Sequence, residues 1–292
     1  MPVAPLGTTP GLRRRLRRQA LGFALLTGAA GAVALPGIRL LGEVLRRGWP
    51  VLGPEFLLAP PRDFLRAGGI GPAVLGTLLL LLGALGVALP LGVGAALYLA
   101  HYARPGPVTA GIRVAVGGLA AVPPIVYGLF GFSLFSVAMG LGRTAAAGAL
   151  TLGILVLPTV ITAAEEALAG VPREYREAAL ALGASRWQAA RRVLLPLALP
   201  GIRSGVALAL ARAAGEAAPI LFMAALFRAG PGGGLGDRPL ALAYHLYAAA
   251  TQVPGLPPER LYGAALVLLA LVMGLMALAL GGGGGGWPER RP

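Results

Sequence analysis

Long apolar stretches constrain this chain more than any other feature, because there are too many of them to bury inside one soluble domain. Six of them approach or exceed the roughly 20 residues that an α-helix needs to cross about 30 Å of hydrocarbon. They are Gln19–Leu41, Ala73–Ala100, Val114–Gly140, Ala145–Ala164, Gly201–Phe227 and Leu261–Leu280. Only 12% of the 292 residues are charged, whereas a soluble domain has about 25%. The sequence therefore predicts an all-α integral membrane protein with about six transmembrane helices.

The basic residues indicate which side of the membrane each segment faces. All 25 of them are Arg, and a cluster directly precedes the first apolar stretch, at Arg13, Arg14, Arg15, Arg17 and Arg18. The positive-inside rule makes that end cytoplasmic, and with it residues 104–113, residues 165–203 and the C-terminal tail. A net charge of +14 can indicate a nucleic-acid partner. Here the Arg residues lie between apolar blocks, which favours contact with anionic membrane lipid. No nucleic-acid partner is therefore expected.

These segments divide the chain into four parts. Residues 1–18 form a basic cytoplasmic N-terminus, residues 19–69 the first transmembrane helix with an external loop, residues 70–280 the main transmembrane domain, and residues 281–292 a Gly-rich cytoplasmic tail. A secretory signal peptide is an alternative for the first apolar stretch, since Ala32-Val33-Ala34 resembles a cleavage site.

Residues 165–203 form the longest polar stretch on the predicted cytoplasmic side. Pro172 suits the first turn of a helix, and Glu174 and Glu177 follow where acidic side chains favour a helix N-terminus. Strong helix formers come next, and Gly183 is placed to end the helix. This pattern predicts a short helix that lies against the membrane instead of crossing it.

A second short helix is predicted directly after the first. Ser185 is a suitable N-cap, and the helix should end near Leu195, before Pro196. Such a pair of helices can fit a groove on a soluble partner, and small side chains at Ala178 and Ala179 let the partner approach closely. An ordinary amphipathic hairpin on the membrane surface is the alternative interpretation.

The same residues resemble the EAA loop of ABC importer permeases. That motif is EAA, three residues, Gly, nine residues, Ile, one residue and Leu-Pro. The chain matches it at Glu177, Ala178, Ala179, Gly183, Val193, Leu195 and Pro196. Val193 in place of Ile is the single departure. The resemblance implies a type I (MetI-like) permease bundle over residues 70–280, whose loop 165–203 docks as a coupling helix, together with Glu174, into an ATP-binding subunit.

Four further segments narrow the resemblance to permeases of the PstA type, which import phosphate. They are residues 70–78, 97–103, 119–130 and 207–222, the last of which reads ALALARAAGEAAPILF. The resemblance implies the membrane subunit of an ATP-driven importer of inorganic phosphate in a bacterial or archaeal plasma membrane. Its implied partners are a second homologous permease, two ATP-binding cassette subunits and an extracytoplasmic phosphate-binding protein. A permease for molybdate or sulfate, or the paralogous phosphate permease, is the alternative.

Two charged residues interrupt the fifth apolar stretch. If residues 201–227 span the membrane, Arg212 and Glu216 lie near the middle, where a charge costs a few kcal/mol. They are four residues apart on one helical face, so they can partly neutralise each other. The planar fork of Arg212 suits an oxyanion, which predicts that this pair lies on a phosphate pathway. A self-contained ion pair that stabilises packing is the alternative.

Three proline residues lie inside predicted spans. Pro123, Pro124 and Pro219 can kink their helices and so provide hinges for inward and outward opening. A proline kink without gating is the alternative.

The sequence lacks the motifs of several kinds of activity. A GxxxxGK[ST] phosphate-binding loop requires Lys, and the chain has none, so we expect ATP and Mg²⁺ to be bound by a partner and no cofactor by this chain. Neither His101 nor His245 has ligand-like spacing, and Cys is absent, so no metal site is expected. No cluster of catalytic side chains suggests an enzyme. A channel or ion-coupled carrier acting alone remains the competing class.

Overall fold

The computed structural model describes residues 10–63, 65–224 and 236–281 and is almost entirely helical there. Five helices in this part of the chain are long and apolar enough to cross a membrane, and a sharply bent helix pair can supply a sixth span. The spans are built from α1 (Pro10–Gly48), α3 (Gly71–His101), the bent pair α4 (Pro107–Ala120) and α5 (Pro124–Gly131), α6 (Ala145–Ala169), α9 (Leu195–Ala214) and α11 (Pro258–Gly281). The predicted all-α, multi-pass membrane protein is confirmed.

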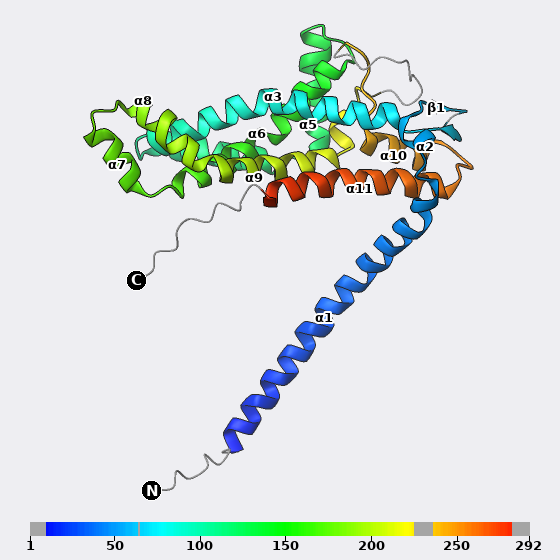
Figure 1. Cartoon of the computed structure of the whole chain (residues 1–292), viewed down its shortest axis with the longest axis horizontal. Coiled ribbons are helices and arrows are strands. Elements are labelled where there is room, and N and C mark those ends of the chain that lie inside the picture. The colour runs from blue at the N-terminus through cyan, green and yellow to red at the C-terminus, as the bar shows by residue number, and fades with distance from the viewer. Residues whose placement is uncertain (1–9, 64, 225–235, 282–292) are drawn as a thin grey trace.

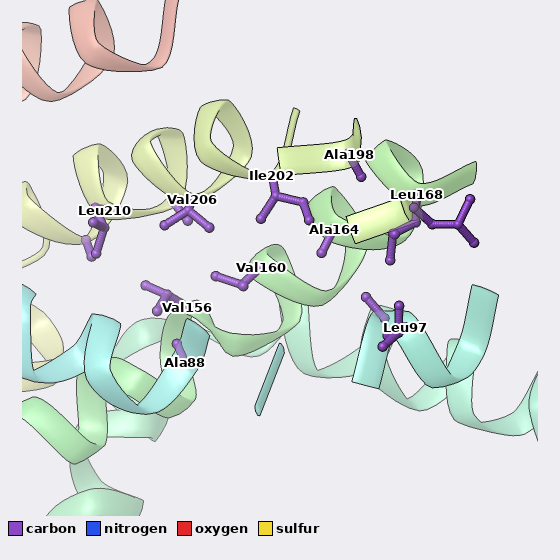
Figure 2. Close-up of a cluster of buried hydrophobic side chains, with 14 of the residues drawn as sticks. Ala88, Leu97, Val156, Val160, Ala164, Leu168, Ala198, Ile202, Val206 and Leu210 are labelled. Atoms are coloured by element: carbon purple, nitrogen blue, oxygen red, sulfur yellow. The ribbon is translucent and has the colours of Figure 1, made fainter. Parts of the chain in front are cut away.

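The centre of the molecule is a bundle in which α6 lies between α3 and α9, and α11 packs on the outer side of α9 (Figure 1). Branched and small apolar side chains from α3, α6 and α9 fill the space between them (Figure 2). These buried residues include Ala88, Leu97, Val156, Val160, Ala164, Leu168, Ala198, Ile202, Val206 and Leu210.

Small residues let two of these helices approach closely. A Cβ added at Gly205 would lie 2.3 Å from the Cβ of Ala163, and one added at Gly201 would lie 2.9 Å from the Cβ of Ala167. Both pairs repeat at four-residue spacing, so they stack along one seam between α6 and α9. Close backbone approach of this kind improves the van der Waals packing that helps helices associate in lipid, where burial of apolar surface adds little.

One end of the bundle carries a cap of short elements, on the right in Figure 1. It contains the 3-10 turn Trp49–Val51, α2 (Pro54–Leu58), the hairpin strands β1 (Pro61–Arg62) and β2 (Ala67–Gly68), and α10 (Leu242–Gln252). Thr77 attaches α10 to α3, because its Oγ1 donates to the Ala73 carbonyl and accepts from the Leu242 amide, both at 2.8 Å. The cap is thus fixed to the bundle by a buried hydrogen bond as well as by packing.

The helix α1 diverges from the bundle over most of its length (Figure 1). Its C-terminal end contacts α11, where the Arg47 guanidinium lies 5.5 Å from the centre of the Tyr262 ring. Its large apolar side chains, such as Leu25 and Val33, are exposed. The predicted span Gln19–Leu41 is therefore helical, but the helix is longer at both ends and continues through Pro36.

The third predicted span, Val114–Gly140, is wrong as a single helix. It is divided into α4 and α5, which meet at an angle of 97°. Pro123 has no N–H group to continue the hydrogen bonds of α4, and the Pro ring that follows it removes a second donor. Beyond α5 the chain continues as the π-helical segment Phe132–Ala138.

The fifth predicted span, Gly201–Phe227, is displaced toward the N-terminus. The continuous helical run covers Arg186–Ala214, and a short 3-10 turn, Ala218–Ile220, follows it. Gly215 lies at the C-cap, and Pro219 cannot donate to an α-helical ladder, so the chain leaves the helix between them. The predicted end at Phe227 lies outside the described residues.

Candidate functional sites at the 165–203 loop and the broken helix

The motif in the 165–203 loop begins on α7 (Arg173–Ala181), as predicted, with Pro172 at its N-cap. Gly183 ends the helix with a φ angle of +84°, a left-handed conformation that glycine adopts without strain. The Gly183 amide donates to the Leu180 carbonyl at 3.0 Å, and the Ala184 amide to the Ala179 carbonyl at 3.1 Å. This pair of bonds fixes the angle at which the chain leaves α7.

The segment after Gly183 differs from the predicted second short helix. Ser185 is its N-cap, as predicted, and exchanges two hydrogen bonds with Gln188 in a capping box. The helix α8 (Arg186–Ala189) does not end at Leu195, however. It continues through the π-helical segment Ala190–Leu194 directly into α9. The wider π turn accommodates Pro196 near the start of α9, so no helix boundary forms at this proline.

The motif residues divide into an outward and an inward set. Glu174, Glu177 and Ala178 are exposed, whereas Ala179 is buried against the chain's own π segment. The small side chain at Ala179 thus lies on the side of α7 that packs within this chain, and the predicted contact of Ala178 and Ala179 with a partner stays a prediction. Val193 and Leu195 are half-buried and Pro196 is exposed.

Two large apolar side chains at the tip of the loop were not singled out from the sequence. Leu182 is 89% exposed and Trp187 is 53% exposed, one on each side of the Gly183 turn. The signal was present in their position beside a helix-ending glycine, but an isolated Leu or Trp is common on any helix. α7 and α8 occupy one end of the bundle (Figure 1), and Ala178, Leu182 and Trp187 are all exposed there.

An ion pair connects this loop to the broken helix. Arg113 on α4 lies 2.7 Å from the Glu165 carboxylate near the end of α6, measured from Nη2 to Oε1. The same guanidinium also donates through Nε, at 2.9 Å. The loop therefore begins at a residue that is paired with α4, the first helix of the α4–α5 bend.

The second site lies where α9 ends beside the break between α4 and α5. Arg212, in the last turn of α9, lines a small cavity of about 20 Å³ together with Pro124 and Tyr127 of α5 and Thr159 of α6. The predicted pathway residue and one predicted hinge residue are thus brought together. The side chain of Arg212 is 68% exposed on this chain, so its charge faces away from the bundle core.

Arg212 and Glu216 form the predicted pair but not in the predicted place. Their side chains approach to 3.9 Å between Nε and Oε1, which is a loose contact. Glu216 lies beyond the end of α9, so the pair is at a helix terminus and not in the middle of a continuous helix. A cation in the last turn is favoured by the helix dipole and by the carbonyl groups left unpaired there.

One side-chain hydrogen bond across the break could not be predicted from the sequence. The Tyr127 hydroxyl of α5 donates to the Leu119 carbonyl in the last turn of α4, at 2.7 Å. The same carbonyl also accepts from the Val122 amide, at 3.1 Å, where the chain leaves α4. Tyr127 is only 6% exposed, so it fixes the angle of the break from the inside.

Pro219 is buried against α5 on the other side of the break. A Cβ added at Gly128 would lie 2.8 Å from the Pro219 carbonyl oxygen. Pro219 therefore follows a helix end and packs on α5, instead of kinking a helix as predicted. Whether Pro123, Pro124 and Pro219 act as hinges stays a prediction. Among the described residues, no group of three or more His, Asp or Glu side chains is placed to hold a metal ion.

The combination of a broken, membrane-embedded helix and an exposed loop at the bundle end defines the class of protein. Residues 88–282 match the family described as the inner membrane component of binding-protein-dependent transport systems. The chain belongs to this family: it is a permease subunit of an ABC transporter, a class that works with an ATPase and a substrate-binding component.

The chain is also similar to individual permeases of named transport systems. The chain is 38% identical to "Phosphate transport system permease protein PstA 1" of Mycobacterium tuberculosis, over 76% of this chain and 74% of the relative. It is 34% identical to "Phosphate transport system permease protein PstA 2" of Mycobacterium bovis, over 95% and 91%. It is 36% identical to "Probable ABC transporter permease protein YqgI" of Bacillus subtilis, over 68% and 67%.

A solved structure shares the fold. A chain from the inward-facing MetNI methionine ABC transporter superimposes with a TM-score of 0.53 at 22% identity, covering 72% of this chain and 91% of that one. The predicted MetI-like bundle is confirmed by this match.

Proposed function

We propose that this chain is the transmembrane subunit of an ATP-driven importer of inorganic phosphate. The observation that carries the proposal is the similarity, over 95% of the chain, to a relative named as a phosphate transport permease. The phosphate pathway is formed with a second, homologous permease. Arg212 and Glu216 lie on that pathway.

The geometry around Arg212 supports an anionic cargo. Arg212 and Pro124, the first residue of α5, line one cavity, so a guanidinium and a helix N-terminus lie near each other. Both favour negative charge, and broken helices in transporters place such N-termini at anionic substrate groups. The loose contact with Glu216 leaves the guanidinium available, since a carboxylate at that distance competes weakly with a phosphate oxygen.

The arrangement of the 165–203 loop supports coupling to an ATPase. Glu177, Ala178, Leu182 and Trp187 form an exposed, partly apolar surface beyond the ends of α3 and α6. We place this surface in the cytoplasm, together with both chain termini, because the Arg-rich segments lie on that side. Two ATP-binding cassette subunits bind ATP and Mg²⁺. Each of them contacts this surface on one of the two paired permeases. This chain supplies no catalytic group and no cofactor.

The partners follow from this arrangement. A phosphate-binding protein delivers the anion at the capped end, where α2, α10 and the β1–β2 hairpin lie. The domains proposed are a basic N-terminus (1–18), a first helix with its external segment (19–69), the importer domain (70–280) and a Gly-rich tail (281–292).

Uptake into vesicles tests the proposal. The chain is reconstituted with the second permease, the ATPase subunits and the phosphate-binding protein, and ATP-dependent uptake of labelled phosphate is measured with sulfate and molybdate as competitors. We expect ATP-dependent accumulation of phosphate that neither competitor suppresses. Uptake of sulfate or molybdate in preference to phosphate would overturn the cargo, and accumulation without ATP would overturn the class.

A further inference from the structure

A second cavity, much larger than the one at Arg212, lies behind α7 at the loop end of the bundle. It has a volume of about 480 Å³, within the range of pockets that hold small organic ligands. Its walls come from the end of α3, the end of α6, α7 and the π segment before α9. Two candidate membrane spans, α3 and α6, both end here, so we expect the cavity at the depth of lipid head groups.

The polar side chains around this cavity are mostly basic. Arg173 and Arg176 of α7 and His101 of α3 line it, and Glu177 is the one acidic residue in its lining. A guanidinium presents paired donors that match phosphate oxygens, so two of them on one wall favour a doubly or singly charged phosphoryl group.

His101 provides the second observation. Its Nε2 is buried and has no hydrogen-bond partner among the described residues. A buried polar atom without a partner is costly and is usually satisfied by a water, an ion or a ligand. This imidazole lines the same cavity as the two Arg side chains, so an anion bound there would supply the missing partner.

The remaining walls are apolar. Ala100, Leu168, Val171, Leu180 and Leu194 line the cavity beside its basic wall. A site with a cationic wall and an apolar wall fits the phosphate and glycerol part of an anionic lipid. It also admits free phosphate with water.

We propose that this cavity binds a phosphoryl anion, held by Arg173, Arg176 and His101, between α7 and the bundle. The anion is the head group of an anionic lipid or free inorganic phosphate, which share this chemistry. Its occupant bridges α7 to the end of α3 and so stiffens the attachment of the 165–203 loop. This site is separate from the Arg212 pathway and does not depend on the proposed transport function.

The test uses the full chain purified with its co-eluting subunits. One arm measures phosphatidylglycerol that remains bound through delipidation, by mass spectrometry. The other arm measures binding of labelled inorganic phosphate to the delipidated protein in an Arg212→Ala background, which separates it from the pathway. The test variant is Arg173→Gln with Arg176→Gln. The matched control is Arg191→Gln with Arg192→Gln, an exposed pair in the same loop that does not line the cavity.

We expect one arm to detect binding that falls about tenfold for each Arg removed and is unchanged in the control. Loss of bound phosphatidylglycerol identifies the lipid as source, and loss of labelled phosphate identifies the free anion. Ala100→Phe fills the cavity without altering charge, so it decides the question if the double variant does not elute as a monodisperse species. Absence of binding in both arms, or binding that survives both the charge and the filling variants, would overturn the proposal.

Discussion

Pro124 and Arg212 line the same small cavity, although α6 and the whole 165–203 loop separate them in the chain. One begins α5 after the break from α4, and the other lies in the last turn of α9. Two interrupted helices therefore meet at one point of the bundle. Irregular backbone of this kind is tolerated within a membrane where it is buried or lines a polar path, which makes this point the centre of the proposed pathway.

Replacing Arg212 tests its role in anion transport. We expect Arg212→Ala to lower phosphate uptake by the reconstituted complex about tenfold to a hundredfold, the worth of a lost charge-assisted hydrogen bond. Arg212→Lys keeps the charge but not the fork, so it should recover only part of the activity. Arg203→Ala removes an exposed Arg from the same helix and serves as control. Full uptake by Arg212→Ala would remove Arg212 from the pathway.

The Tyr127 hydrogen bond should stabilise the broken helix. Tyr127→Phe removes one donor to the Leu119 carbonyl and leaves the Val122 amide in place, and we expect the free energy of unfolding in detergent to fall by about 0.5–1.5 kcal/mol. Tyr98→Phe, at an exposed position on α3, should change it by less than about 0.5 kcal/mol. Equal stability of the two variants would show that the bond does not hold the break.

The seam between α6 and α9 should not tolerate a larger side chain. At Gly205 an added Cβ already meets the Cβ of Ala163, so Gly205→Val should destabilise the purified subunit by about 1–3 kcal/mol through overpacking. Gly94→Val introduces the same side chain on α3, where nothing lies within 4 Å. Thermal unfolding of the two variants gives the comparison, and a Gly205→Val protein as stable as Gly94→Val would contradict the close approach.

The buried imidazole of His245, on α10 at the capped end, should make stability depend on pH. Burial, with the Arg260 charge as a second cause, lowers the pKa of His245 from 6.5 to about 4. The unfolded chain therefore binds a proton at higher pH than the folded chain does. Stability is full above pH 6.5 and is lost as the pH falls toward 4.

Between pH 7.5 and 4.5 this single group should lower the free energy of unfolding by about 2–3 kcal/mol. His245→Gln should remove that part of the pH dependence. The measurement is denaturant unfolding of both proteins in detergent at the two pH values. An identical loss of stability in the variant would show that other groups cause it.

Much of the fold could be predicted from the sequence because lipid imposes a simple pattern. Long apolar stretches located the spans, except for the break in the third and the ends of the fifth, and Gly183 and Ser185 predicted the helix end and the N-cap by local chemistry alone. The motif also located α7, although it did not indicate that Ala179 is buried while Ala178 is exposed. These features depend on neighbours in the sequence, which is why they could be read without coordinates.

The remaining features depend on contacts between distant segments. The predicted span Gly201–Phe227 followed hydropathy, which cannot distinguish a helix from the irregular apolar backbone after Gly215. Nothing near Ala179 in the sequence indicates that it faces its own π segment. Likewise, Tyr127 reads in the sequence as one aromatic residue in an apolar block. Only the 97° bend brings its hydroxyl within hydrogen-bond distance of the Leu119 carbonyl.

The central claim is that the 165–203 loop faces an ATPase inside the cell, and labelling of a single cysteine tests it most directly. The chain has no Cys, so Ala178→Cys, at an exposed position on α7, creates one unique site for a membrane-impermeant maleimide. Leu58→Cys, at a position 79% exposed at the capped end, is the matched control. We predict that intact cells label Leu58→Cys and leave Ala178→Cys unlabelled until the membrane is permeabilised. Labelling of Ala178→Cys in intact cells would contradict the account, because no cytoplasmic ATPase could then reach the loop.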